Sequence, residues 1–283
     1  MNKACTVLRK LMAENQYLVA PCAFDALSAK AIEQAGFQVA GTTGQGLHGT
    51  IIGQPDNGLL AFNEMVSACG KIADAIEIPL LCDAEGGYGN AINVIRTVRE
   101  FERAGAAGIF IEDQKLPPNC PFIKAAETIS VEQMCGKIRA AVEARRDKDF
   151  VIVARTDAPF DEAIERAQAY LEAGADMIKP IPKNMKELEM WPQKVKAPLH
   201  VGFMSNVNAG LTSKDIGQMG YKFITFPLNM LFMYAKSCQR YLDTIMRDGT
   251  DQALAGEFMD FMEYQKFIGM DTYISNQTKY IFE

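Results

Sequence analysis

The chain has 283 residues, of which 48% are apolar, and a formal net charge of −6. This apolar content is enough to bury a full core, and the acidic balance argues against nucleic-acid binding. The sequence contains no apolar run long enough to span a membrane, and its N-terminus lacks a secretory signal pattern. The seven cysteines are scattered and form no C-x-x-C pair, which is typical of a reduced compartment. We therefore expect a cytoplasmic protein with neither a nucleic-acid nor a membrane partner.

One pattern recurs along the chain: an amphipathic helix closes on a glycine, and a short apolar run follows. The four copies lie at 32–43, 101–113, 170–180 and 216–226. Their glycines suit a left-handed residue at the end of a helix, and the apolar runs suit strands buried on both faces. Further strand candidates lie at 17–21, 78–83, 149–155 and 197–202. Eight strands that alternate with helices predict an α/β fold, a closed (β/α)8 barrel of the TIM type. The absence of a G-x-G-x-x-G motif after the first strand argues against an open dinucleotide-binding sheet.

The chain continues well beyond the eighth predicted strand. Residues 228–268 form two helix-like stretches rich in Met and Phe, with more apolar surface than one closing helix requires. Two interpretations stay open from the residues alone: a larger core, or a contact exchanged between subunits. We predict a single barrel domain over residues 1–283, in which 228–283 is a C-terminal helical oligomerisation extension.

Polar residues gather where the predicted strands end. They are Thr42, Thr43 and Gly44 after strand two, Asp56 in the loop beyond it, Asp83 and Glu85 after strand three, Glu112 and Asp113 after strand four, and Arg155, Thr156 and Asp157 after strand five. In a parallel barrel these strand ends share one mouth, where chemistry takes place. Carboxylates that converge there repel each other unless a cation neutralises them, and oxygen ligands favour magnesium or manganese. The alternative is that each acid caps a turn and pairs with a surface base.

Several motifs resemble the isocitrate lyase/phosphoenolpyruvate mutase superfamily over nearly the whole chain. They are APCAFDALSAKAIEQAGF near the start, DAEGGYGN, IEDQ, VARTDA followed by DEAIERAQAYLEAGADM, and FPLNMLF after the eighth strand. The resemblance implies a barrel whose last helix is exchanged between subunits, usually in a homotetramer. It also implies cleavage of a C–C or P–C bond next to a 2-oxo or 2-hydroxy acid.

The resemblance also implies a role for individual residues. Magnesium would bind at Asp83, with Glu85, Asp56 and Glu112 arranged around it, partly through water. Thr43, Gly44 and Gln45 fall on the family's oxyanion-binding turn, and Arg155 falls on its substrate-binding arginine. Cys120 keeps the position of the catalytic cysteine of the lyases.

The sequence departs from the family pattern at three places. Glu85 replaces the usual second aspartate of a D-x-D pair. The gating loop reads KLPPNCPF at 115–122, so Cys120 lacks the flanking Lys, Arg and His that favour a thiolate. Ile181 stands at the end of strand six, where the family has a polar residue.

These observations favour a magnesium-dependent lyase, with manganese as a possible substitute, that cleaves a C–C bond of a small 2-hydroxy or 2-oxo dicarboxylic acid through a metal-stabilised enolate. Cys120 is its candidate proton donor. The first alternative is P–C bond chemistry on phosphonopyruvate or phosphoenolpyruvate, in which the neutral Asn119 would suffice on the loop and Lys115 could supply positive charge. The second is a non-catalytic barrel that retains only fold and oligomer. We expect His48 to hydrogen-bond within its loop and His200 to be a satisfied core residue.

Overall fold

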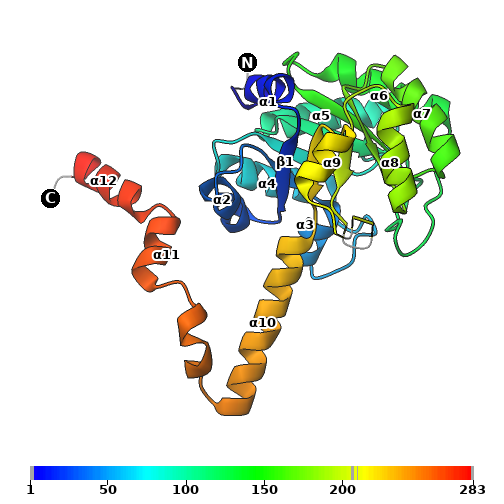
Figure 1. Cartoon of the computed structure of the whole chain (residues 1–283). Helices are drawn as coiled ribbons and strands as arrows, with labels where there is room; N and C mark the ends of the chain where they lie inside the picture. Colours follow the sequence, from blue (N-terminus) through cyan, green and yellow to red (C-terminus); the bar gives the residue numbers. More distant parts are fainter. Residues whose placement is uncertain (1–2, 205–206, 209, 282–283) are drawn as a thin grey trace. The chain divides into compact units, whose positions relative to one another are not determined.

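A computed structural model describes residues 3–204, 207–208 and 210–281. The chain packs into two compact units, residues 1–230 and 231–283. The first unit contains the strands with the helices around them, and the second contains the C-terminal helices from most of α10 onward (Figure 1). None of the helices in the described ranges is both long and apolar enough to cross a membrane.

Within the described residues, eight strands form one parallel sheet in the order β6-β5-β4-β3-β2-β1-β8-β7, and a bridge between Ile178 and Leu199 joins β6 to β7. The strands are β1 (Leu18–Ala23), β2 (Ala40–Thr42), β3 (Leu80–Asp83), β4 (Gly108–Glu112), β5 (Val151–Thr156), β6 (Met177–Pro180), β7 (His200–Gly202) and β8 (Phe223–Phe226). Each lies inside or next to a predicted strand. The predicted (β/α)8 barrel is therefore confirmed.

Helices connect successive strands of the first unit. They are α2 (Ala26–Gln34), α3 (Gly44–Ile51), α4 (Phe62–Asp74), α5 (Ala91–Arg103), α6 (Val131–Ala144), α7 (Phe160–Glu172), α8 (Met185–Lys194) and α9 (Ser213–Met219), preceded by α1 (Lys3–Glu14). The recurrent glycines stop four of them, because each has a positive φ: 89° at Gly36, 94° at Gly105, 105° at Gly174 and 113° at Gly220. Glycine adopts this conformation without steric cost, so the chain turns there from helix to strand.

The strands are buried on both faces. Their outward side chains pack against the helices in the main core, in which Phe101, Phe150 and Trp191 are among the largest buried side chains. A smaller cluster fills the barrel interior and includes Leu18 and Phe223, with Leu8 of α1 packed into it. Because α1 packs against residues such as Leu18 at the start of a strand, the opposite ends of the strands remain available for a site.

The second unit consists of most of α10 (Asn229–Asp248), a short 3-10 helix (Gln252–Glu257), α11 (Phe261–Phe267) and α12 (Met270–Tyr280). Many of its large apolar side chains are exposed, including Phe232, Met233, Leu242, Met246, Phe261, Met262, Tyr273 and Ile274. A run of exposed apolar groups of this extent is typical of an interface.

Candidate active site

The end of β3 is the centre of the candidate site. Asp83 is 5% exposed, and its two carboxylate oxygens accept hydrogen bonds from Gly44 N (2.8 Å) and Glu85 N (3.0 Å). Its own N–H donates to Thr42 Oγ1 at 2.9 Å. Beyond Asp83 the chain turns sharply, with φ of 50° at Glu85 and 59° at Tyr88. Non-glycine residues rarely adopt these angles, and strained backbone of this kind is concentrated at functional sites.

Gly44 is the point on which three acids converge. A Cβ added at Gly44 would collide with Glu85 Oε1 and would lie 2.6 Å from Asp56 Oδ2, while the Gly44 N–H already binds Asp83. A side chain at this position would require both carboxylates to move. Thr43, the neighbouring residue of the predicted oxyanion turn, caps α3 by accepting a hydrogen bond from Gly46 N at 2.9 Å. In this structure Thr43 and Gly44 therefore orient α3 and Asp83.

His48 holds the loop that carries Asp56. Its Nε2 accepts hydrogen bonds from Leu59 N and Leu60 N, each at 3.1 Å, so this nitrogen is unprotonated and Nδ1 carries the proton. Nδ1 then donates to Gly44 O at 2.9 Å and lies 3.3 Å from Asp56 Oδ1. Both ring nitrogens are occupied, so His48 orients the Asp56 loop and is not available as a metal ligand. The expectation that His48 bonds within its loop is confirmed.

A substitution at His48 tests this role. We expect His48→Ala to weaken Mn²⁺ binding about 10- to 100-fold, the usual cost of losing a group that orients a ligand, because the N–H groups of the exposed Leu59 and the buried Leu60 lose their acceptor. His48→Gln, which retains an acceptor oxygen, should restore part of the affinity. Titration calorimetry measures both variants, and wild-type affinity in His48→Ala would contradict the assignment.

Arg155 is already paired with two acids. Its guanidinium lies 2.9 Å from Glu112 Oε2 and 2.9 Å from Asp157 Oδ1, while its buried Nε has no hydrogen-bond partner. Glu112 is 4% exposed, and its N–H donates to Glu85 O at 2.9 Å, which joins β4 to the Asp83 turn. Burial raises the pKa of Glu112 to about 8, although the charge of Arg155 opposes this shift.

The acids of the site are more crowded than their protein partners can neutralise. Burial raises the pKa of Asp56 to about 6, with the charge of Asp83 as the next cause. Burial and the charges of Asp83 and Asp56 raise the pKa of Glu85 well above its usual range. Asp56 Oδ1 and Glu85 Oε1 are buried without hydrogen-bond partners. Hard oxygen donors that converge without partners are the set a divalent cation such as magnesium requires, so these residues fit one.

Residues 115–127 form the loop after β4 for which the sequence predicts a gating role, and this loop is called the lid below. Its base is closed by a bridge between Gln114 and Thr128 and by the hydrogen bond from Lys115 N to Glu127 O (2.8 Å). Within it, Asn119 N donates to the buried Gln114 Oε1 at 2.8 Å. Lys115 Nζ lies 3.3 Å from Glu127 Oε2 in an exposed ion pair. Lys115, which the sequence suggested as a cation for a phosphoryl group, therefore forms an ion pair with Glu127 at the base of the lid.

The lid is anchored on both sides of Cys120. On one side Pro118 lies against the Asp56 loop, since a Cβ added at Gly58 would be 3.0 Å from Pro118 Cδ. On the other side Lys183, from the loop after β6, donates to Pro121 O at 3.0 Å. Partial burial lowers the pKa of Lys183, and the charges of Asp157, Arg155 and Cys120 also act on it. Lys183 is therefore a cation near the site, and the sequence analysis did not identify it. Its position directly after strand six could have indicated that it lies at the mouth of the barrel.

A second lysine that sequence reasoning missed lies inside the barrel. Lys179 is 8% exposed, pairs in register with Arg155, and has its Nζ 3.3 Å from the ring centroid of Phe110. Burial, together with the charge of Arg155, lowers the pKa of Lys179 to about 8. The sequence could have indicated Lys179, because it is a charged residue within the apolar pattern of a predicted strand. His200 is buried nearby, with Nε2 3.1 Å from Thr225 Oγ1 and its ring edge-on to Phe110. Its Nδ1 has no hydrogen-bond partner, so the expected core position is confirmed, but the expectation that its hydrogen bonds are satisfied is wrong.

Comparison with known proteins agrees with this geometry. The profile of the phosphoenolpyruvate phosphomutase family matches residues 8–246. The 2,3-dimethylmalate lyase of Eubacterium barkeri is 37% identical over 280 residues, which cover 96% of both chains. The 2-methylisocitrate lyase of Aeropyrum pernix is 37% identical over 273 residues, covering 94% of this chain and 88% of that protein.

A solved structure of a family member has the same fold as this chain. The crystal structure of phosphoenolpyruvate phosphomutase from Streptomyces platensis superposes with a TM-score of 0.92 at 29% identity, covering 99% of this chain and 100% of that chain. The motifs, the barrel and the acids at its strand ends thus point to one conclusion: the chain belongs to the phosphoenolpyruvate phosphomutase family, within the isocitrate lyase/phosphoenolpyruvate mutase superfamily.

Proposed function

We propose that the protein is a magnesium-dependent lyase that cleaves a carbon–carbon bond of a small 2-hydroxy or 2-oxo dicarboxylic acid. The observation that carries this proposal is the convergence of Asp83, Glu85 and Asp56 on Gly44, with two buried carboxylate oxygens left without a hydrogen bond. The relatives named 2,3-dimethylmalate lyase and 2-methylisocitrate lyase support carbon–carbon cleavage over the alternatives.

Asp83, Glu85 and Asp56 would hold Mg²⁺, or Mn²⁺ in its place, with Glu112 contributing through water. When bound, the cation supplies Lewis-acid stabilisation of negative charge on the substrate's carboxylate and C2 oxygen. Arg155 then binds a substrate carboxylate in one of two ways. Its Nε, which has no hydrogen-bond partner, donates to the substrate, or the substrate carboxylate replaces Glu112 or Asp157 at the guanidinium. Gln45 lies at the start of α3 beside Gly44, where helix N–H groups favour developing negative charge.

The lid supplies the proton and excludes water. In a 2-hydroxy acid the hydroxyl proton passes to a carboxylate of the site, the C2–C3 bond breaks, and its electron pair is delocalised into the carboxyl group on C3. Cys120, which lies on the lid between the anchors at Pro118 and Pro121, returns a proton to C3. A closed lid keeps bulk water from competing for this step.

Phosphorus–carbon chemistry on phosphonopyruvate is the second candidate, and Asn119 beside Cys120 is the residue that favours it. A phosphoryl group requires cations that are free to bind it. Lys115 is paired with Glu127, and Arg155 with Glu112 and Asp157, which leaves Lys183 and the buried Lys179. A barrel kept only for fold and assembly is disfavoured, because crowding buried acids costs stability that such a protein has no reason to lose.

A panel of acids tests the proposed function. We expect at least one of the dicarboxylates 2,3-dimethylmalate and oxaloacetate, or the related tricarboxylate 2-methylisocitrate, to release a 2-oxo acid, detected by NMR. Release should require Mg²⁺ or Mn²⁺ and should exceed the rate in the same buffer without protein, because divalent cations alone decarboxylate oxaloacetate. Phosphonopyruvate should stay unchanged in the same buffer. Consumption of phosphonopyruvate alone, followed by ³¹P NMR, would replace the proposal with the second candidate.

We further propose a cytoplasmic homotetramer. All seven cysteines are free, which suits a reducing compartment. The exposed apolar side chains of α10 to α12 suit an interface between copies of the chain. Light scattering should give four times the 31.2 kDa chain mass at micromolar concentration. Deletion of residues 231–283 should abolish the tetramer, whereas a stable full-length monomer would refute the prediction.

A further inference from the structure

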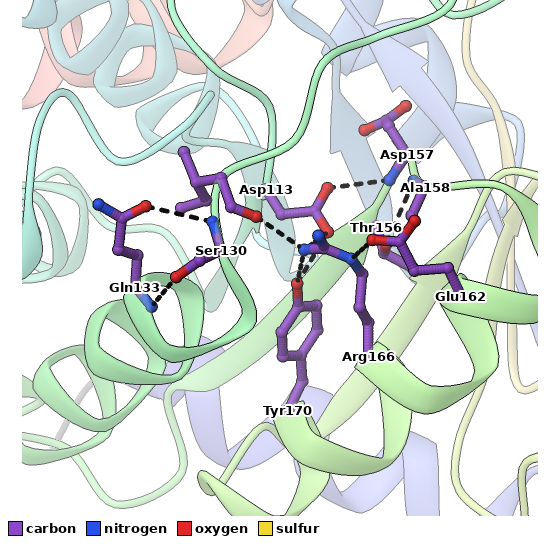
Figure 2. Close-up of polar contacts among 10 residues, drawn as sticks. Asp113, Ser130, Gln133, Thr156, Asp157, Ala158, Glu162, Arg166 and Tyr170 are labelled. Atoms are coloured by element: carbon purple, nitrogen blue, oxygen red, sulfur yellow. Dashed lines mark hydrogen bonds and ion pairs between the residues drawn. The ribbon is translucent and has the colours of Figure 1, made fainter.

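Asp113, Arg166 and Tyr170 form a second buried polar cluster, separate from the acids around Gly44 (Figure 2). The Tyr170 hydroxyl donates to Asp113 Oδ2 at 2.8 Å and accepts from Arg166 Nη1 at 3.0 Å. Arg166 Nη1 also lies 3.3 Å from Asp113 Oδ2. Asp113 and Tyr170 are fully buried and Arg166 is 5% exposed. Asp113 belongs to the IEDQ motif, and Arg166 and Tyr170 belong to DEAIERAQAY. The proposed chemistry gives none of these three side chains a role.

The cluster holds the strand end that carries Arg155. Asp113 Oδ1 accepts a hydrogen bond from Asp157 N at 3.0 Å, as Figure 2 shows, and the Asp157 carboxylate binds the Arg155 guanidinium at 2.9 Å. The Asp113 N–H donates to Arg155 O at 3.2 Å. The backbone on both sides of Thr156 is thereby tied to one buried residue, to the Asp113 carboxylate at Asp157 N and to the Asp113 N–H at Arg155 O. Any displacement of Asp113 would be transmitted to the Arg155 side chain through Asp157.

The same cluster holds the end at which the lid rejoins the barrel. Arg166 Nη1 donates to Ile129 O at 2.9 Å, and Ile129 N donates to Asp113 O at 2.8 Å. The next residue, Ser130, caps α6 and exchanges hydrogen bonds with Gln133, both at 3.2 Å (Figure 2). With one nitrogen, Arg166 therefore contacts both the backbone two residues beyond the lid, at Ile129, and the Asp113 carboxylate behind Arg155.

We propose that Arg166 is a positioning residue that couples closure of the lid to the placement of Arg155, acting through Asp113. This inference rests on the proposed function only in assuming that Arg155 and the lid act on one substrate. Arg166 contacts none of the proposed cation ligands. Its loss should therefore disturb turnover and the lid while leaving cation binding intact.

The main test uses Arg166→Gln, which keeps side-chain length but loses the charge and the fork of donors. We expect turnover to fall about 100-fold, the usual effect of a displacement of about 1 Å at a binding group. Arg166→Lys should recover about tenfold of this loss, because an ammonium can still bind Asp113. The Mn²⁺ dissociation constant should stay within about twofold of wild type. A purely structural role would lower Tm without changing turnover of the folded protein at 25 °C.

A second readout is independent of the substrate. In a Cys238→Ser background the remaining cysteines other than Cys120 are buried, so iodoacetamide reports on exposure of the lid cysteine. Arg166→Gln should raise the alkylation rate of Cys120 at least about fivefold. Glu162→Gln is the matched control, because Glu162 contacts Arg166 Nε at 2.7 Å from the exposed side and leaves the inward contacts in place. Both its turnover and its alkylation rate should match wild type.

The outcomes separate this inference from the proposed function. If the wild-type protein cleaves none of the acids, the proposed function fails, but faster alkylation in Arg166→Gln would still support the link to the lid. Wild-type turnover together with a wild-type alkylation rate in folded Arg166→Gln would overturn the inference. If Arg166→Gln does not fold, Tyr170→Phe removes only the hydroxyl. It should raise alkylation about twofold or more, and an unchanged rate would overturn the inference.

Discussion

Asp83→Ala is expected to abolish Mg²⁺ and Mn²⁺ binding and to lower turnover by at least about three orders of magnitude, while the chain stays folded. The Asp83 side chain lies at the centre of the site, because it accepts hydrogen bonds from Gly44 N and Glu85 N and lies among the other acids. Loss of a direct cation ligand removes the Lewis acid on which the proposed reaction depends. Loss of one buried negative charge also relieves repulsion with Glu85 and Asp56, which offsets the two lost hydrogen bonds.

The measurement is a pair of thermal melts with and without Mg²⁺, together with Mn²⁺ titration calorimetry. Wild-type protein should gain about 2.7 kcal/mol of unfolding free energy when the cation is at 100 times its Kd, whereas Asp83→Ala should gain none. Asp74→Ala, which removes an exposed acid from α4, is the control and should behave as wild type. Full activity of Asp83→Ala, or of wild type in excess chelator, would rule out the cation site.

Cys120→Ser is expected to lower kcat by at least about two orders of magnitude with little change in KM. A hydroxyl is a far weaker acid than a thiol, so protonation of the departing carbon slows. Substrate affinity should persist, because Arg155 and the cation site hold the acid and do not involve the lid cysteine. Steady-state kinetics on the substrate found in the panel measure both constants.

Two controls make the Cys120 result specific. Cys238→Ser changes a cysteine of α10 outside the first unit and should leave kcat unchanged. Asn119→Ala tests the neighbouring lid residue and should cost far less than Cys120→Ser under the lyase mechanism. A serine variant with wild-type turnover would remove Cys120 from the mechanism and shift the proton-handling role toward Asn119 and phosphorus–carbon chemistry.

The barrel could be predicted because its determinants are local. Gly36, Gly105, Gly174 and Gly220 each end a helix, and an apolar strand follows each one. Parallel closure then brings the strand ends together, which is why separated acids such as Asp83 and Glu112 could be assigned to one site.

The remaining features of the site depend on contacts that sequence spacing does not encode. Lys183 and Pro121 are 62 residues apart and meet only because the lid folds back toward the loop after β6. The tautomer of His48 is decided by the N–H groups of Leu59 and Leu60, which belong to a loop of irregular backbone. The left-handed φ of Glu85 could not be predicted from the sequence, because glutamate seldom adopts it. The pairing of Arg155 with both Glu112 and Asp157 likewise required side-chain geometry.

The most direct measurement of the central claim is turnover in deuterium oxide with whichever 2-hydroxy acid the panel identifies, followed by NMR of both product fragments. Carbon–carbon cleavage with return of a proton to the departing carbon predicts one solvent deuteron per molecule at that carbon, in a non-exchangeable position, and only when Mg²⁺ or Mn²⁺ is present. A fragment without deuterium at that carbon, or products formed at the same rate without a divalent cation, would contradict the proposed reaction.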